Sequence, residues 1–225
     1  TAVNVAHQQA RVAVLNMEHD LHNAVSVPQL TDANKVGIAG NGPAAGIALR
    51  AYAAGPFQVV STAAAGQKQI TVAFPDYTPK VGQRLCLPLH QVELDIVGIG
   101  SGTNRVITLA SNLPRPIETS LDDAGTLKPV NVTCFLTDRY TYVVNGGELR
   151  YFKPGETVGK LLANDITSPS PFSIPVTPMG APYNRFVAAI NLSTADHTSS
   201  NRRFKAANMF LNALVPYRAK LCDFQ

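Results

Sequence analysis

The sequence predicts an α+β fold, with one N-terminal amphipathic helix packed on antiparallel β-sheets. Residues 3–27 contain neither Gly nor Pro and place apolar side chains at helical spacing, which predicts one long helix. All 16 Gly and all 16 Pro residues follow that segment, and they divide the remaining chain into pieces too short for further long helices. The 225 residues are enough to bury a sizeable core in one large domain or two small ones.

The helix is expected to span about 24 residues and to end at Pro28. Its apolar side chains recur at alternating spacings of four and three residues: Ala10, Val14, Met17, Leu21 and Ala24. We expect this stripe to pack on the sheet and on partner helices in an assembly. Val12 and Leu15 widen the apolar surface beside it. Residues 1–28 form the first expected domain.

A β-rich head is expected over residues 29–225. Strand signals bounded by turn residues follow in order: 47–52, 57–61, 69–74, 84–89, 92–99 and 106–109. The part around residues 57–113 predicts a β-meander inserted into a larger sheet. Asn145-Gly146-Gly147 then separates two β-rich runs, 140–144 and 148–152, which predicts a hairpin. Residues 186–192 and 209–215 predict two last strands.

Composition and charge narrow the class of function. Charged residues make up 15% of the chain, against about 25% in an average soluble domain, and this favours an extracytoplasmic protein. The net charge of +4 is mild and scattered, so it does not require a nucleic-acid partner. No stretch approaches the roughly 18 apolar residues that a membrane-spanning helix needs.

The helix carries the pattern closest to a metal site, in which His19 and His22 share a face beside Glu18 and Asp20. A zinc site needs three or four convergent ligands, and nothing else in the chain has fixed ligand spacing. We therefore expect a solvated polar face and no metal. Neither a nucleophile elbow nor a Ser, His and carboxylate pattern is present, so no catalytic residue, cofactor or enzymatic activity is expected.

A basic cluster near the end of the chain is a weak nucleic-acid candidate. Its members are Arg202, Arg203 and Lys205, with Arg218 and Lys220 further along. Only Phe204 and Tyr217 interleave them, whereas nucleic-acid surfaces commonly combine basic and aromatic side chains. A solvated loop is the interpretation that this pattern favours.

The order of these segments resembles the type IV pilin-like minor subunits, in particular the W-type minor pilins and the J-type minor pseudopilin of type II secretion. The similar segments are the helix end at 17–24, the meander at 81–113, the hairpin at 140–150, the step at 161–166 and the closing strand at 210–218. The apolar first half of the family's helix, with the Glu near its start, is absent here. Truncation before Thr1 would explain that difference.

The resemblance implies a pilin-like fold and a structural subunit that assembles into, or caps, a type IV pilus or a type II secretion pseudopilus. Its implied partners are other minor pilins or pseudopilins and the major subunit. The implied location is the cell envelope, with a precursor anchored in the inner membrane by the missing helix and a periplasmic or extracellular head. Nucleic acid would be a partner only in a DNA-uptake pilus.

The chain has three cysteines, Cys86, Cys134 and Cys222, and one pair plus one buried thiol is the simplest extracytoplasmic arrangement. The resemblance implies a disulfide between Cys134 and Cys222, because many pilins close their C-terminal region in this way. A pair of Cys86 with Cys134, or three reduced thiols, are the alternatives. The alternative function is a secreted or surface adhesin-like β domain that binds carbohydrate or a surface partner around Tyr183-Asn184 and the 193–203 loop.

Overall fold

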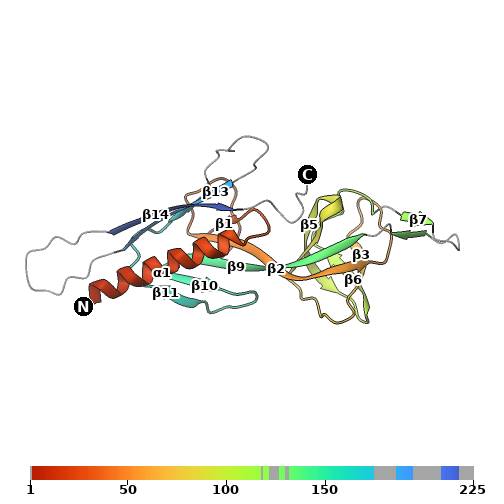
Figure 1. The fold of residues 1–225 in the computed structure, drawn as a ribbon, viewed down its shortest axis with the longest axis horizontal. Helices are drawn as coiled ribbons and strands as arrows, with labels where there is room; N and C mark the ends of the chain where they lie inside the picture. Colours follow the sequence, from red (N-terminus) through yellow and green to blue (C-terminus); the bar gives the residue numbers. More distant parts are fainter. Residues whose placement is uncertain are drawn as a thin grey trace, which may run out of the picture. The chain divides into compact units, whose positions relative to one another are not determined.

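A computed structural model describes residues 2–117, 119–121, 127–129, 132–174, 186–194 and 209–217 of the chain (Figure 1). Of the residues that the structure describes, 47% lie in strands and 12% in helix. The α+β, pilin-like fold expected from the sequence is therefore wrong, and the chain is mostly antiparallel β-sheet with one short N-terminal helix. The physical reason is that the segments after Pro28 alternate strand-forming runs with turn residues, so strands fill the chain once the helix has ended.

The elements, in chain order, are α1 (Ala2–His22), β1 (Gln29–Thr31), β2 (Gly46–Val59), β3 (Gln69–Ala73), β4 (Arg84–Leu87), the short 3₁₀-helix η1 (Pro88–His90), β5 (Val92–Ile99), β6 (Asn104–Leu109), β7 (Thr119–Leu121), β8 (Leu127–Pro129), β9 (Thr133–Asn145), β10 (Glu148–Phe152), β11 (Lys160–Ala163), β12 (Phe172–Ser173), β13 (Phe186–Thr194) and β14 (Met209–Tyr217). A nine-stranded sheet has the order β1-β2-β3-β6-β5-β4-β9-β10-β11, and β2 also pairs with β9. The remaining strands form a three-stranded sheet, β12-β13-β14, and a separate pair, β7-β8.

The helix ends at His22 and does not continue to Pro28. Asn23 ends it, because its side-chain Nδ2 donates a hydrogen bond of 2.9 Å to the carbonyl oxygen of His19. Two residues later the backbone N–H of Val25 donates to the carbonyl oxygen of Arg50 at 2.9 Å, so the backbone that follows the helix is hydrogen-bonded to β2. The absence of Gly and Pro permits a helix up to Pro28, but it does not show where tertiary contacts end it.

The chain divides into two compact units. One, the helix unit, contains Thr1–Ala51 and Arg139–Ala219; the other, the barrel unit, contains Tyr52–Asp138 and Lys220–Gln225. The helix therefore belongs to the same unit as β1, the first part of β2 and the strands from the end of β9 onward, whereas the sequence suggested a division near residue 28. The inserted unit is also larger than the meander expected around 57–113. Both β2 and β9 contribute residues to each unit.

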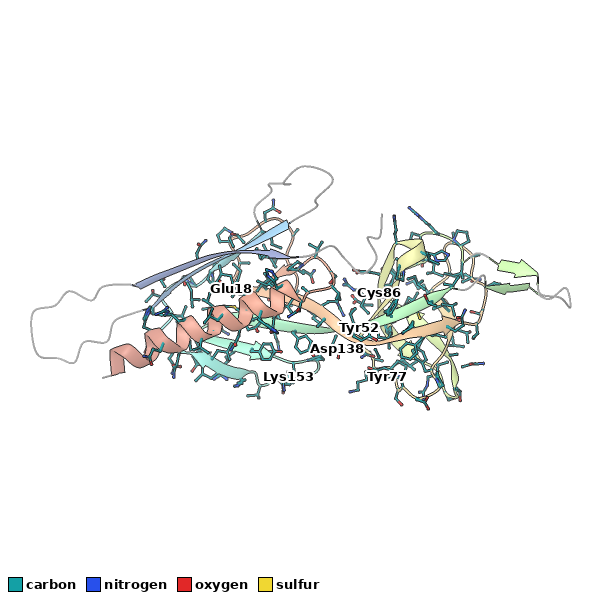
Figure 2. The ribbon with its side chains drawn as sticks, viewed as in Figure 1. Glu18, Tyr52, Tyr77, Cys86, Asp138 and Lys153 are labelled. Atoms are coloured by element: carbon teal, nitrogen blue, oxygen red, sulfur yellow. The ribbon has the colours of Figure 1, made fainter. Side chains whose placement is uncertain are left out.

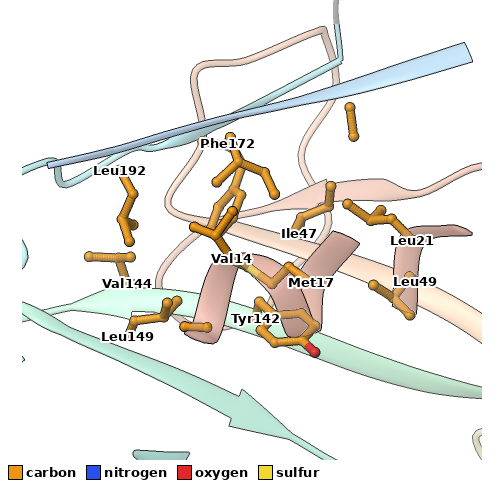
Figure 3. Packing of buried hydrophobic residues seen from close by; sticks show 14 of the residues in the cluster. Val14, Met17, Leu21, Ile47, Leu49, Tyr142, Val144, Leu149, Phe172 and Leu192 are labelled. Carbon is orange, nitrogen blue, oxygen red and sulfur yellow. The ribbon is translucent and has the colours of Figure 1, made fainter. Parts of the chain in front are cut away.

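In the helix unit, one face of α1 and side chains from both β-sheets share a single apolar core (Figure 3). The largest fully buried members include Met17, Leu21, Ile47, Tyr142 and Phe172. The three-stranded sheet is joined to this core through the backbone bridge between Ala44 and Phe172. Because the unit buries its apolar groups around α1, the helix is a central element of its core.

The predicted hairpin is confirmed. Asn145 of β9 pairs with Glu148 of β10, and Gly146 and Gly147 form a two-residue turn between them. Both glycines have positive φ angles, 58° and 81°, which residues with a Cβ rarely adopt. The strand signals in residues 69–74, 92–99 and 106–109 are likewise confirmed as β3, β5 and β6.

In the barrel unit, the pairings form a ring of six strands. The order β2-β3-β6-β5-β4-β9 closes because β9 also pairs with β2, and the N–H of Val59 donates to the carbonyl oxygen of Val132 at 2.9 Å. Apolar side chains from all six strands form one buried cluster, including Val59, Val72, Leu85, Ile96, Ile107 and Leu136. Small closed barrels of this kind are filled by their own side chains, so this interior is a packed core.

Candidate interaction surfaces

The apolar stripe of α1 lies inside the helix unit. All of its members are at most 8% exposed: Ala10, Val14, Met17, Leu21 and Ala24. The same cluster contains buried residues from β2, β9, β10 and β13. The stripe is thus occupied by contacts within the unit. A neighbouring subunit would have to contact another face of the helix.

The opposite side of α1 carries two exposed apolar side chains, Val12 and Leu15, here called the outer helix face. Their exposed fractions are 56% and 62%. Residues three apart on a helix lie side by side, so the two side chains form one apolar spot. Gln8, Arg11 and Asn16 around them are exposed and polar. Contiguous apolar patches rimmed by polar residues mark protein contact sites, and these two neighbouring side chains would be the centre of such a patch.

Two residues of the metal-like cluster, His19 and Asp20, take part in side-chain hydrogen bonds. The Nδ1 atom of His19 lies 3.2 Å from Oδ1 of Asp20, and the other carboxylate oxygen of Asp20 accepts a 2.6 Å hydrogen bond from Tyr142. His22 is exposed. Within the described ranges, no three His, Cys, Asp or Glu side chains are grouped so that they could hold a metal ion.

Burial and the contact with Asp20 both raise the pKa of Tyr142 well above its usual value, with burial the larger cause. Tyr142 also packs against Tyr151, with ring centroids 4.9 Å apart. Burial raises the pKa of Tyr151 to about 12. These phenols therefore stay protonated at neutral pH and serve the packing between α1 and the sheet.

Cys86 and Cys134 are both buried free thiols. In the β4–β9 ladder Cys86 lies opposite Phe135, so the adjacent Cys134 projects from the other face of the sheet. Cys134 belongs to the barrel core, whereas the Sγ of Cys86 lies 3.8 Å from Oε1 of Glu93. This geometry argues against a Cys86–Cys134 disulfide. Cys222 lies outside the described residues, so its pairing with Cys134 stays a prediction.

Burial raises the pKa of the Cys134 thiol to about 12, with a smaller contribution from Cys86. A thiol with such a pKa holds almost no thiolate at neutral pH, and the thiolate is the reactive form. Cys134 is therefore a core side chain without nucleophilic character.

The remaining predicted sites fall outside the described residues. They are the basic cluster Arg202, Arg203 and Lys205, and the adhesin-like candidates at Tyr183-Asn184 and over most of the 193–203 loop. The prediction of a weak nucleic-acid site there is unchanged.

Sequence reasoning missed a pocket on the barrel unit, here called the aromatic pocket. Its volume is about 390 Å³, and it is lined by Pro56, Phe57, Gln58, Ala73, Pro75, Asp76 and Tyr77. The lining comes from β2 and from the end of β3 with the residues that follow it. The signal in the sequence was the run Pro75-Asp76-Tyr77, which combines a rigid ring, a charge and an aromatic group.

Both aromatic rings of the pocket are held in place from beneath. Phe57 packs edge-on against the buried Phe74, with centroids 4.7 Å apart, and lies 5.5 Å from the ring of Tyr77. The Nε2 group of Gln83 donates to the hydroxyl of Tyr77 at 2.8 Å and to Oδ1 of Asp138 at 3.0 Å. Figure 2 labels Tyr77 and Asp138.

Gln83 is itself fixed, because its Oε1 accepts a 2.8 Å hydrogen bond from the backbone N–H of Lys80. Its exposed fraction is only 3%. A buried amide with both its oxygen and its nitrogen bonded has one orientation, so the Tyr77 side chain is preorganised by its neighbours.

A scan against models of known protein families, a search of curated proteins and a search of solved structures each found no match. Among the helical residues described here, none form a segment long and apolar enough to cross a membrane.

Proposed function

We propose that this chain is a non-catalytic structural subunit whose outer helix face contacts a neighbouring subunit in a larger assembly. The observation that carries the proposal is the exposure of Val12 and Leu15 at 56% and 62% on a helix whose opposite face is buried. Leaving two large apolar side chains in water forgoes roughly 1.5–3 kcal/mol for each one that a partner could cover.

The residues around the helix support a structural role. The carboxylate of Asp20, a member of the metal-like cluster, is hydrogen-bonded to Tyr142 and His19. Tyr142 and Tyr151 have raised pKa values and stay neutral. These groups join α1 to the sheet and stiffen the helix unit. A rigid helix presents its outer face with little loss of entropy on binding.

The specific form of the proposal is a minor subunit of a type IV pilus or of a type II secretion pseudopilus. It rests on the resemblance of the helix end, hairpin and closing segments, and not on a pilin-like fold. In this form the partners are other minor pilins or pseudopilins and the major subunit. The location is the cell envelope, with the described residues on the periplasmic or extracellular side of an inner-membrane anchor.

The proposal is tested with the full-length protein in its own cells, by measuring how much of it enters the sheared surface or pseudopilus fraction. Leu15→Glu places a charge on the outer helix face, and we expect it to reduce incorporation at least about tenfold, because a buried unpaired charge costs several kcal/mol. Val158→Glu is the matched control, since Val158 is apolar, 79% exposed and in the same unit but off the helix.

Both purified variants should unfold at the same urea concentration as the wild type, since both positions are exposed. Incorporation of Leu15→Glu at the wild-type level would overturn the proposal. Equal loss for both variants would show a surface requirement that is not specific to the helix, and would overturn it as well.

A further inference from the structure

We propose that the aromatic pocket of the barrel unit binds an arginine side chain presented by a partner protein. The pocket combines two aromatic rings and two proline rings with one carboxylate, that of Asp76. Its volume of about 390 Å³ falls within the range of small ligand sites. An arginine side chain, with an apolar stem and a flat cation, matches this combination of surfaces.

Charge complementarity selects a cation. Asp76 is the only charged residue among those that line the pocket. It is exposed, and the described part of the chain provides no ion pair or hydrogen bond for its side chain. Other charged groups of the same unit do have partners: the guanidinium of Arg84 pairs with the carboxylates of Asp95 at 3.0 Å and Glu93 at 3.6 Å. The pocket thus offers an uncompensated negative charge beside two aromatic rings, a type of side chain that attracts cations.

The rings favour arginine over lysine. A guanidinium group is planar, stacks on aromatic faces and can donate two parallel hydrogen bonds to one carboxylate. Phe57 and Tyr77 are tilted by 36° at 5.5 Å, and Asp76 is the residue before Tyr77 in the chain. An ammonium group is a compact, strongly hydrated charge and gains less from such a surface.

The aromatic side chains of the pocket are fixed by buried contacts, which an incidental surface depression would not need. Gln83 is almost fully buried and directs its amide at the Tyr77 hydroxyl, while its other bonds hold Lys80 and Asp138. Phe57 is seated on Phe74 in the barrel core. Such preorganisation lowers the entropy that ligand binding would otherwise lose.

This inference goes beyond the proposed function and is independent of it. All residues that line the pocket belong to the barrel unit, whereas the outer helix face belongs to the helix unit. Variants of Leu15 test the helix contact, and variants of Asp76 test the pocket. Either proposal can fail while the other holds.

The test uses the full chain, labelled with ¹⁵N, and follows the backbone amides of Phe57, Gln58, Asp76 and Tyr77 by NMR. The probe is Nα-acetyl-L-arginine amide, compared with Nα-acetyl-L-lysine amide and methyl β-glucoside. We expect saturable shifts of the pocket amides at millimolar arginine probe. The lysine probe should bind more weakly, and the glucoside should cause no shifts.

Asp76→Asn should weaken binding of the arginine probe about two- to fivefold, as expected for a partly exposed ion pair. High salt should weaken binding of this probe to the wild type by a similar factor. Tyr77→Leu should weaken it further, whereas Tyr77→Phe, which keeps the ring, should retain most of it. Glu18→Gln is the matched control, because it removes one carboxylate from the helix unit; it should bind the probe like the wild type.

Three results would overturn the inference. The first is no shift of the pocket amides with any probe while the spectrum shows a folded chain. The second is an equal effect of Asp76→Asn and Glu18→Gln. The third is a response to the glucoside without a response to arginine, which would show a saccharide site in place of an arginine site.

Discussion

The hydroxyl of Tyr142 on β9 donates a 2.6 Å hydrogen bond to the carboxylate of Asp20 on α1. The two residues are far apart in the sequence, so this hydrogen bond joins the N-terminal helix to a strand from the second half of the chain. The ring of Tyr142 is part of the core, and the residue is only 2% exposed. The pair sets the helix against the sheet and leaves Val12 and Leu15 facing outward.

The stability of the helix unit should fall at high pH. Tyr142 and Tyr151 have raised pKa values in the folded chain, whereas tyrosine in an unfolded chain titrates near about 10. Above pH ~10 the unfolded state loses protons that the folded state keeps, so unfolding becomes more favourable. Below that pH the contribution is fully present. Urea unfolding measured from pH 8 to 11 should show a declining midpoint.

Tyr142→Phe removes the bond to Asp20 and should lower the free energy of unfolding by about 1–2 kcal/mol at pH 7. It should also make the decline above pH ~10 shallower. An identical pH profile for the variant and the wild type would show that Tyr142 does not cause the decline.

The two faces of α1 should respond very differently to truncation. Met17 is fully buried in the shared core, and Met17→Ala should cost about 2–5 kcal/mol in the free energy of unfolding. Leu15→Ala, on the exposed face, should change it by less than about 0.5 kcal/mol. Urea titrations of both variants measure this difference, and comparable losses would place Leu15 in the core.

Cys134 should resist alkylation in the folded protein. Its thiol is buried and its pKa is raised to about 12, so the thiolate that reacts with iodoacetamide is scarce at pH 8. Peptide mapping should show labelling of Cys134 in the folded chain far slower than in the reduced, unfolded chain. Rapid labelling in native buffer would contradict the position of Cys134 in the barrel.

Cys86 and Cys134 should not form a disulfide with each other on mild oxidation of the folded chain. They project from opposite faces of the sheet, and a disulfide requires converging Cβ directions. Non-reducing peptide maps test this directly. A linked pair of the two peptides would contradict the register between β4 and β9.

Gln83→Met should destabilise the barrel unit by about 1–3 kcal/mol, because it removes the part-buried acceptor of the Lys80 N–H and the buried donor to Tyr77 and Asp138. The same variant should broaden or shift the NMR signals of Tyr77, whose hydroxyl loses its donor. Gln69→Met is the control, since Gln69 is exposed on β3 and pairs through its backbone. Equal effects of the two variants would refute the supporting role of Gln83.

The parts of the fold that depend on local chemistry were predictable from the sequence. The turn at Gly146-Gly147 follows from a backbone requirement for positive φ, and the strands that flank it follow from their residue types. A helix was predictable from the apolar spacing, but its end at His22 was not: Asn23 bonds back to the carbonyl oxygen of His19, and the chain then pairs with Arg50, which lies far away in the sequence. The α+β, pilin-like class was wrong because strands, and not the helix, make up most of the fold.

The features that depend on distant pairing were not predictable. Residues 47–52 and 57–61 indicated two strands, yet one strand, β2, runs from Gly46 to Val59. The ring of six strands needs β2 to meet β9. The aromatic pocket exists only because the pairing of β2 with β3 brings Phe57 near Tyr77. Contacts of this kind leave no periodic signal in a single sequence.

The most direct test of the proposed assembly role is site-specific photo-crosslinking in cells. A photoreactive phenylalanine analogue replaces Leu15 on the outer helix face in the full-length protein, and Val158 in the matched control. We expect an adduct between position 15 and another subunit of the filament or pseudopilus, identified by mass spectrometry, and none from position 158. An adduct from position 158 with none from position 15 would overturn the proposed role of the outer helix face.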